Sequence, residues 1–125
     1  SYLGEGLTLQ RSLADYLHEL LAAKGLKRAD VYRASGLNST VVYDAFSGKS
    51  RLGRDNALMV AFGLGCSLRE TQRLLKLAGA AELYPKVRRD AIIIWCIDRG
   101  MSREACDDEL WRFGEKTLLG TCPLQ

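Results

Sequence analysis

Apolar residues along the chain recur at three- and four-residue spacing, which is typical of amphipathic helices, and the alternation typical of strands is nearly absent. The first predicted helix begins near Ser12, which has Asp15 at the reciprocal position of a capping box, and it ends at Gly25. Its apolar face carries Leu13, Leu17, Leu20 and Leu21. Four more helices are predicted over residues 28–35, 39–46 and 55–64 and between Ser67 and Gly79.

The C-terminal part of the chain repeats the pattern of residues 54–83 at an offset of 35 residues. The Ile-rich segment 91–97 suits a strand as well as a helix, but the repeat favours a helix that has Pro85 in its first turn and runs through Ile97 to Gly100. The matching positions are Arg54-Asp55 and Arg89-Asp90, Gly65 and Gly100, Ser67 and Ser102, Leu75 and Leu110, Gly79 and Gly114, and Leu83 and Leu118. We therefore expect a helical hairpin over residues 86–114. Chance matching of common helix ends is the alternative, and it also leaves the segment helical.

Composition adds bounds to this picture. The chain has 125 residues, of which 47% are apolar and 26% charged, so we expect one all-α domain over residues 1–125 that folds without metal or disulfides. No apolar stretch approaches the ~20 residues that span a membrane. The four cysteines lack zinc-site spacing, and we interpret His18 as a solvated surface residue, so no metal or cofactor is expected. Because no secretory signal precedes the first helix, we expect a cytoplasmic location.

Charge is unevenly distributed along the chain. The net charge is +3, but residues 24–54 hold seven basic and two acidic residues, a local balance of +5. Residues 1–23 and residues 100–125 each sum to −2. A basic middle between acidic ends indicates one surface that can meet phosphate groups.

Residues 9–79 resemble the lambda-repressor-like helix-turn-helix family, the Cro and phage-repressor group that is also called XRE-type. The resemblance rests on Val31 and Val42 as buried residues of two short helices, on the turn Gly36-Leu37-Asn38 between them, on the Gly48-Lys49 loop and on the sequence GLGCS at 63–67. It implies a five-helix helix-turn-helix domain, which the C-terminal hairpin would extend. Tyr32 stands where the family usually has a small residue and Ala45 where a larger one is common, which indicates an exchange of volume.

The resemblance also implies a function: a transcriptional regulator that binds double-stranded DNA and reads its major groove with the helix over residues 39–46. The base-facing positions would be Ser39, Thr40, Tyr43 and Asp44. The contacts to phosphate would be Arg28, Lys49, Arg51 and Arg54. Asp44 would accept a hydrogen bond from a cytosine amino group.

Two other classes of function stand beside DNA binding, and the role of the C-terminal hairpin has two alternatives of its own. An enzyme is disfavoured, because the acidic cluster Asp107 to Glu109 suits the start of a helix and no nucleophile and base are arranged as a set. A protein-interaction module on the same scaffold would present Tyr43, Asp44 and Phe46 to a protein partner. The C-terminal hairpin, with an acidic outer side, would either form a homodimer seam with Trp111 and Leu118 or use its aromatic residues to complete the core of the monomer.

Overall fold

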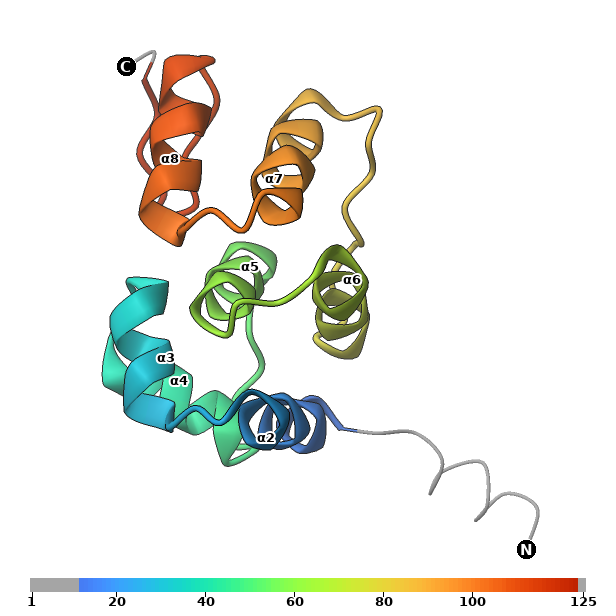
Figure 1. Cartoon of the computed structure of the whole chain (residues 1–125), viewed down its shortest axis with the longest axis vertical. Helices are drawn as coiled ribbons and strands as arrows, with labels where there is room; N and C mark the ends of the chain where they lie inside the picture. The colour runs from blue at the N-terminus through green and yellow to red at the C-terminus, as the bar shows by residue number, and fades with distance from the viewer. Residues whose placement is uncertain (1–11, 124–125) are drawn as a thin grey trace, which may run out of the picture.

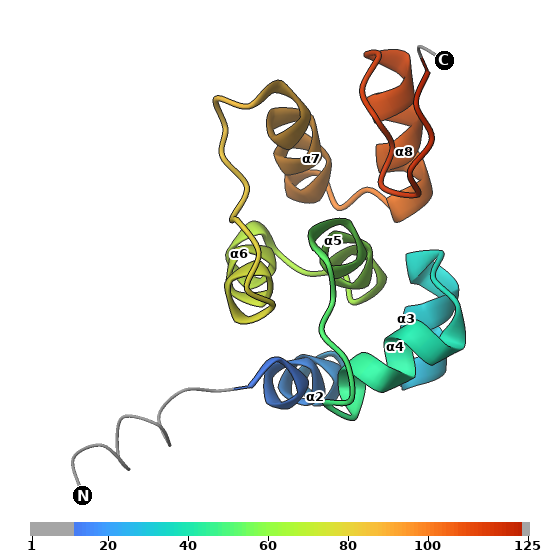
Figure 2. The same cartoon turned by 180° about the vertical axis from the view of Figure 1, so that it is seen from behind.

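The computed structural model of the chain describes residues 12–123, and this part holds seven helices and no strand. The helices are α2 (Leu13–Lys24), α3 (Arg28–Ser35), α4 (Ser39–Phe46), α5 (Arg54–Gly63), α6 (Leu68–Leu77), α7 (Arg88–Asp98) and α8 (Arg103–Arg112). The all-α expectation is confirmed for the described residues. Figures 1 and 2 show three stacked layers: α2 to α4 at one end, α5 and α6 in the middle, and α7 and α8 at the other end.

Helix ends lie where the sequence places Ser caps and Gly stops. The Ser12 hydroxyl accepts the Asp15 N–H at 3.1 Å, and the Ser67 hydroxyl and the Glu70 carboxylate cap each other's N–H groups. Ser102 caps α8 by accepting the Ala105 N–H at 3.0 Å. Gly25 follows α2 with φ near +64°, a conformation that glycine adopts without steric cost.

One predicted boundary was wrong. Helix α7 begins at Arg88, so Pro85 lies in the turn before the helix and not in its first turn. The reason is a pair of bonds that close this turn: the Val87 N–H donates to the Tyr84 carbonyl at 3.0 Å, and the Tyr84 N–H donates to the Asp90 carboxylate at 2.9 Å.

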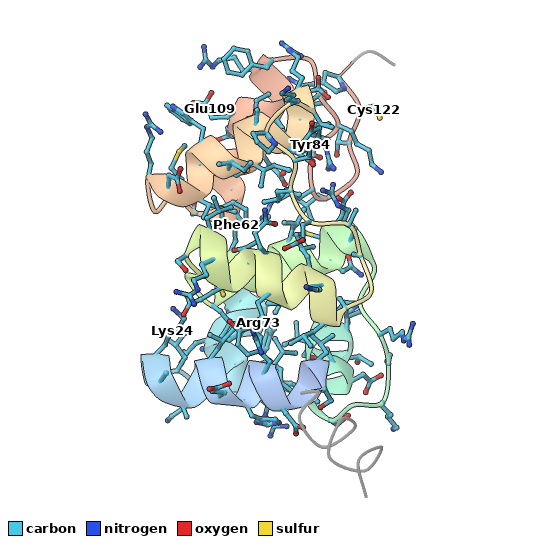
Figure 3. The ribbon with its side chains drawn as sticks, turned by 90° about the vertical axis from the view of Figure 1, so that its right-hand side faces the viewer. Lys24, Phe62, Arg73, Tyr84, Glu109 and Cys122 are labelled. Atoms are coloured by element: carbon cyan, nitrogen blue, oxygen red, sulfur yellow. The ribbon has the colours of Figure 1, made fainter. Side chains whose placement is uncertain are left out.

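The first five described helices share one core. Helix α3 crosses α5 at Gly63, where a Cβ atom would lie 2.7 Å from the Val31 carbonyl oxygen, so the close approach requires glycine. Helix α2 is tied to α6 by an ion pair of 3.0 Å between Lys24 and Glu70. Burial acts to raise the pKa of Glu70, but hydrogen bonds from Ser67 and Lys24 outweigh it and lower that pKa. Figure 3 shows α2 lying against the middle layer on this side of the molecule.

The two hairpins α5–α6 and α7–α8 pack on each other through matching contacts. Arg54 donates two hydrogen bonds to the Asp90 carboxylate, at 3.1 and 2.8 Å, and Arg89 donates two to the Asp55 carboxylate, at 3.0 and 3.2 Å. Because Arg54 and Arg89 are equivalent in the repeat, as are Asp55 and Asp90, each hairpin gives the other the same contact that it receives. This is the pattern of a twofold-related pair.

The equivalence continues in the loop that follows each hairpin. Arg54 also donates to the carbonyls of Ala81 and Glu82 at 2.9 and 3.1 Å. Arg89 donates to the carbonyls 35 residues later, those of Lys116 and Thr117, at 2.8 and 3.2 Å. The predicted repeat is therefore present in tertiary contacts, and chance matching of helix ends does not account for it.

Three expectations for the C-terminal hairpin were wrong. Asp107 is buried: its carboxylate accepts from Arg103 at 2.7 Å and from the Leu118 N–H at 2.6 Å, so of the predicted acidic outer side only Asp108 is fully exposed. Leu118 is buried too, and it is not available for a seam with the exposed Trp111. Trp95 and Phe113 are also exposed, so the aromatic residues do not complete the core of the monomer.

Candidate nucleic-acid interface

Two short helices, α3 and α4, are joined by a three-residue turn that its own side chains hold. Gly36 ends α3 with φ near +83°. The buried Ser35 hydroxyl donates to the Tyr32 carbonyl at 2.9 Å and accepts the Leu37 N–H at 3.1 Å. Asn38 then caps α4 by accepting the Val41 N–H at 2.9 Å. Local hydrogen bonds within residues 32–41 thus fix the turn. Arg103 of α8 lies against Gly36, within 2.9 Å of where a Cβ atom would be.

Helix α4 has one buried and one accessible face. Val42, Ala45 and Phe46 are buried, so the idea that Phe46 meets a protein partner is wrong. Of the four predicted base-facing residues, Thr40 is exposed, and the other three are partly exposed: Ser39, Tyr43 and Asp44. The accessible face therefore carries hydroxyl groups and one carboxylate.

Tyr43 is held in place by residues of α3. The Arg28 guanidinium lies 4.9 Å from the centre of the Tyr43 ring, and the Tyr32 ring meets it edge-on at 5.9 Å. Arg33 lies 5.7 Å from the centre of the Tyr32 ring. Tyr32 and Arg33 were not predicted as site residues; the unusual size of Tyr32 was noted in the sequence, but it was interpreted there as an exchange of volume with Ala45.

The loop after α4 is folded back onto the helix end. The Asp44 carbonyl accepts from the Lys49 N–H at 2.9 Å and from the Ser47 hydroxyl at 3.1 Å. Gly48 has φ near +77°, which lets the chain turn there. The exposed Lys49 and Arg51 line a hollow of about 350 Å³ together with the first residues of α2.

Of the four predicted phosphate contacts, Arg28, Lys49 and Arg51 are exposed, and the Arg51 guanidinium lies 3.8 Å from the Cβ position of Gly79 at the end of α6. Arg28 lies on Tyr43 of α4, and Lys49 and Arg51 lie in the loop after it. Among the described residues, none of these three cations has an ion-pair partner, and the Asp44 carboxylate has none either. The positive charges of Arg28, Lys49 and Arg51 are therefore free to meet an anionic ligand.

Arg54 is the exception, because its guanidinium is occupied within the protein by Asp90 and two carbonyls. Burial acts to raise the pKa of Asp90, but hydrogen bonds from Arg54 and the Tyr84 N–H outweigh it, and the pKa of this carboxyl is lowered. A carboxylate that stays ionised beside Arg54 keeps this arginine in the joint between the hairpins.

His18 and the buried cysteines are engaged in contacts within the fold. The Nε2–H group of His18 donates to the Phe46 carbonyl at 2.8 Å, so this exposed ring ties α2 to the end of α4. Burial raises the pKa of Cys66 to about 12 and also raises the pKa of Cys96 and Cys106, so these thiols are protonated at neutral pH. Within residues 12–123 no three His, Cys, Asp or Glu side chains are grouped so as to hold a metal ion.

Comparison with known proteins finds no family model that matches this chain, no similar curated protein and no similar solved structure. In the described part of the chain, none of the helices is long and apolar enough to cross a membrane.

Proposed function

We propose that the chain is a DNA-binding protein, not an enzyme, in which α3 and α4 form a helix-turn-helix of the lambda-repressor-like type and α4 enters the major groove. Regulation of transcription is the corresponding role. The observation that carries the proposal is a set of three cations without ion-pair partners. Arg28 lies over Tyr43 of α4, and Lys49 and Arg51 follow α4, a short helix whose accessible face is polar. Cations in this position neutralise phosphates on either side of a groove, while the helix between them meets base edges.

Recognition of a particular DNA sequence would rest on few side chains of α4. The Thr40 hydroxyl is the most accessible, and Ser39 lies beside it at the start of α4. Tyr43 is fixed by Arg28 and Tyr32, so its hydroxyl would be presented in one orientation. Helix α4 contains no Arg, Lys, Gln or Asn, the residues that most often form bidentate contacts to bases. We therefore expect weak discrimination between sequences and a dominant phosphate contribution to affinity.

The salt dependence of binding to a random-sequence duplex tests this directly. Three phosphate contacts at about −0.9 each give a log–log slope of about −2.7. Lys49→Ala should weaken binding to all duplexes alike and flatten the slope by about 0.9. Fluorescence anisotropy with a labelled duplex, between about 50 and 200 mM NaCl, measures both quantities.

A matched pair of arginines controls for the loss of charge. Arg28 lies over Tyr43 at 4.9 Å, and Arg73 of α6 lies over Tyr16 at 5.6 Å, so the two side chains have similar surroundings on different helices. Arg28→Ala should weaken DNA binding, and Arg73→Ala should not. Equal weakening by both changes would mean that affinity follows the total charge and not the α3–α4 surface, and it would contradict the proposal, as would binding that does not depend on salt.

A protein partner at the same surface is the second candidate, and the free carboxylate of Asp44 is what favours it. An acid that faces phosphates opposes DNA binding, so Asp44→Asn should tighten binding to every duplex if α4 lies in the groove. Unchanged affinity would mean that Asp44 is directed away from DNA, and it would favour the protein partner.

A further inference from the structure

The hairpin α7–α8 has an apolar face that no other helix of the described chain covers. We call it the α7–α8 face; its floor is Ile92, Trp95 and Phe113, and its rim is Arg88, Arg99 and Arg112. All of these residues except Arg99 line a hollow of about 470 Å³ between the two helices. Arg99 lies over the Trp95 ring, 3.9 Å from its centre.

The repeat shows what covers the equivalent face of the other hairpin. Position 95 corresponds to Val60, whose side chain is completely buried, whereas Trp95 is 44% exposed. Val60 lies one turn before Gly63, the residue at which α3 crosses α5. The position equivalent to Gly63 is Asp98, which is exposed. Trp95 is exposed where Val60 is buried, so this position of α7 lacks the cover that its equivalent on α5 has.

The rim of this face presents guanidinium groups. Arg88 pairs with Glu115 and Arg112 with Glu109, at 2.8 and 2.7 Å, and in both pairs the carboxylate is turned inward. The side chain of Arg88 is 61% exposed against 25% for Glu115, and that of Arg112 is 66% exposed against 21% for Glu109. Arg112 and Arg88 lie over the Phe113 ring, 4.5 and 5.8 Å from its centre, so a ligand that approaches the hollow meets guanidinium groups on the aromatic floor itself.

We propose that the α7–α8 face binds an amphipathic helix of a partner protein, with large apolar side chains that enter the hollow and acidic residues that meet the arginines. A helix is the occupant because a helix covers the equivalent side of α5, and because an open groove between two helices accepts the apolar face of a third. Acidic flanks follow from the arginine rim. Tryptophan and arginine are also the residues in which binding energy concentrates at protein interfaces.

A second copy of the chain fits the same face less well. Two copies that meet through this face bring two arginine rims together, and like charges placed opposite each other oppose association. The inference does not depend on DNA binding, because the α7–α8 face and α4 lie in different layers of the molecule (Figures 1 and 2).

The test uses the full chain and a labelled, end-capped helical peptide with Leu at positions i, i+4 and i+7 and Glu at the flanking positions. Anisotropy should show saturable binding, and a peptide with Lys in place of each Glu should bind at least tenfold more weakly. Trp95→Ala should reduce affinity for the Glu peptide at least tenfold. Trp111→Ala is the matched control, since Trp111 is equally exposed but lies outside the hollow, and this change should leave affinity unchanged.

Three results would overturn the proposal. One is equal binding of the Glu and Lys peptides, and another is equal loss of binding in Trp95→Ala and Trp111→Ala. The third is a dimer of the unmodified chain in sedimentation that Trp95→Asp converts to a folded monomer, because the occupant would then be a second copy. Far-ultraviolet circular dichroism of each variant verifies that a loss of binding is not a loss of folding.

Discussion

The hairpins α5–α6 and α7–α8 share a backbone plan but differ in what surrounds them. Both have a Ser-capped second helix, a Gly stop after each helix, and an arginine that reaches across to the other hairpin. The first hairpin is packed on both sides, with α3 crossing α5 on one and α7–α8 on the other. The second is packed on one side only, so Trp95, Trp111 and Phe113 stay exposed.

The comparison distinguishes residues that fix the backbone and the joint of each hairpin from residues that decide what packs against it. Residues that end helices and join the hairpins are the same in both copies, because they fix the local backbone and the joint. Residues away from the joint differ: Gly63, which lets α3 approach α5 closely, and the buried Val60 correspond to the exposed Asp98 and Trp95. Equivalent residues are therefore identical where the two hairpins contact each other and differ at Val60 and Gly63, away from that contact.

The largest expected effect concerns positions at which the hairpins are alike. Leu75 and Leu110 are equivalent and completely buried, so replacing either one with Ala should lower the free energy of unfolding by about 3 kcal/mol. Urea denaturation followed by circular dichroism measures both losses. A much smaller loss for Leu110→Ala would mean that the second hairpin unfolds independently of the first.

The arginines that join the hairpins should differ in importance. Arg54→Ala leaves the Asp90 carboxylate, which is 5% exposed, without its charged partner, and we expect a loss of about 2 kcal/mol. Arg89→Ala should cost about 1 kcal/mol, because Asp55 is 26% exposed and keeps Lys116 nearby. The exposed Arg69 provides the control, and its change to Ala should be close to neutral in the same denaturation experiment. Equal losses for all three arginines would contradict a specific joint.

These two predictions show how far sequence reasoning reaches. Gly and Ser at helix ends act on neighbouring residues, so the sequence alone predicted the repeat and the helix boundaries other than the start of α7. The partner of Arg54 lies 36 positions away, and no local pattern distinguishes an arginine that meets phosphate from one that meets Asp90. Asp107 was misjudged for the same reason, since its partners include the Leu118 N–H, which a turn of the chain brings back to α8.

Gly63 and its equivalent in the second hairpin, Asp98, should respond differently to replacement by Ala. Gly63→Ala places a Cβ atom 2.7 Å from the Val31 carbonyl oxygen, so we expect a net loss of about 1.5 kcal/mol even though Ala favours helices. At the equivalent open position, Asp98→Ala should change stability by less than about 0.5 kcal/mol. Thermal denaturation of the two variants decides the matter, and a stabilised Gly63→Ala would show that α3 does not cross α5 so closely.

The smallest effect is a dependence on pH. The pKa of Asp90 is lowered on folding, because bonds from Arg54 and Tyr84 outweigh the effect of burial. The stability that this carboxylate contributes is therefore present above its unfolded pKa, near 3.9, and is lost as the pH falls through the lower folded value. Between neutral pH and about pH 3, the unmodified chain should lose more stability than Asp90→Asn does. Parallel losses in the two proteins would argue against an ionised Asp90 in the joint.

The reciprocal ion pairs between the hairpins also bear on the order in which the chain folds. They join residues 34 and 36 positions apart, whereas the caps and the Gly stops act within a few residues. Contacts that close long loops form only after the loop entropy has been overcome, so each hairpin should be built before the two are joined. Loss of the Arg54 pair is then expected to act on the rate of unfolding and to leave the rate of folding nearly unchanged.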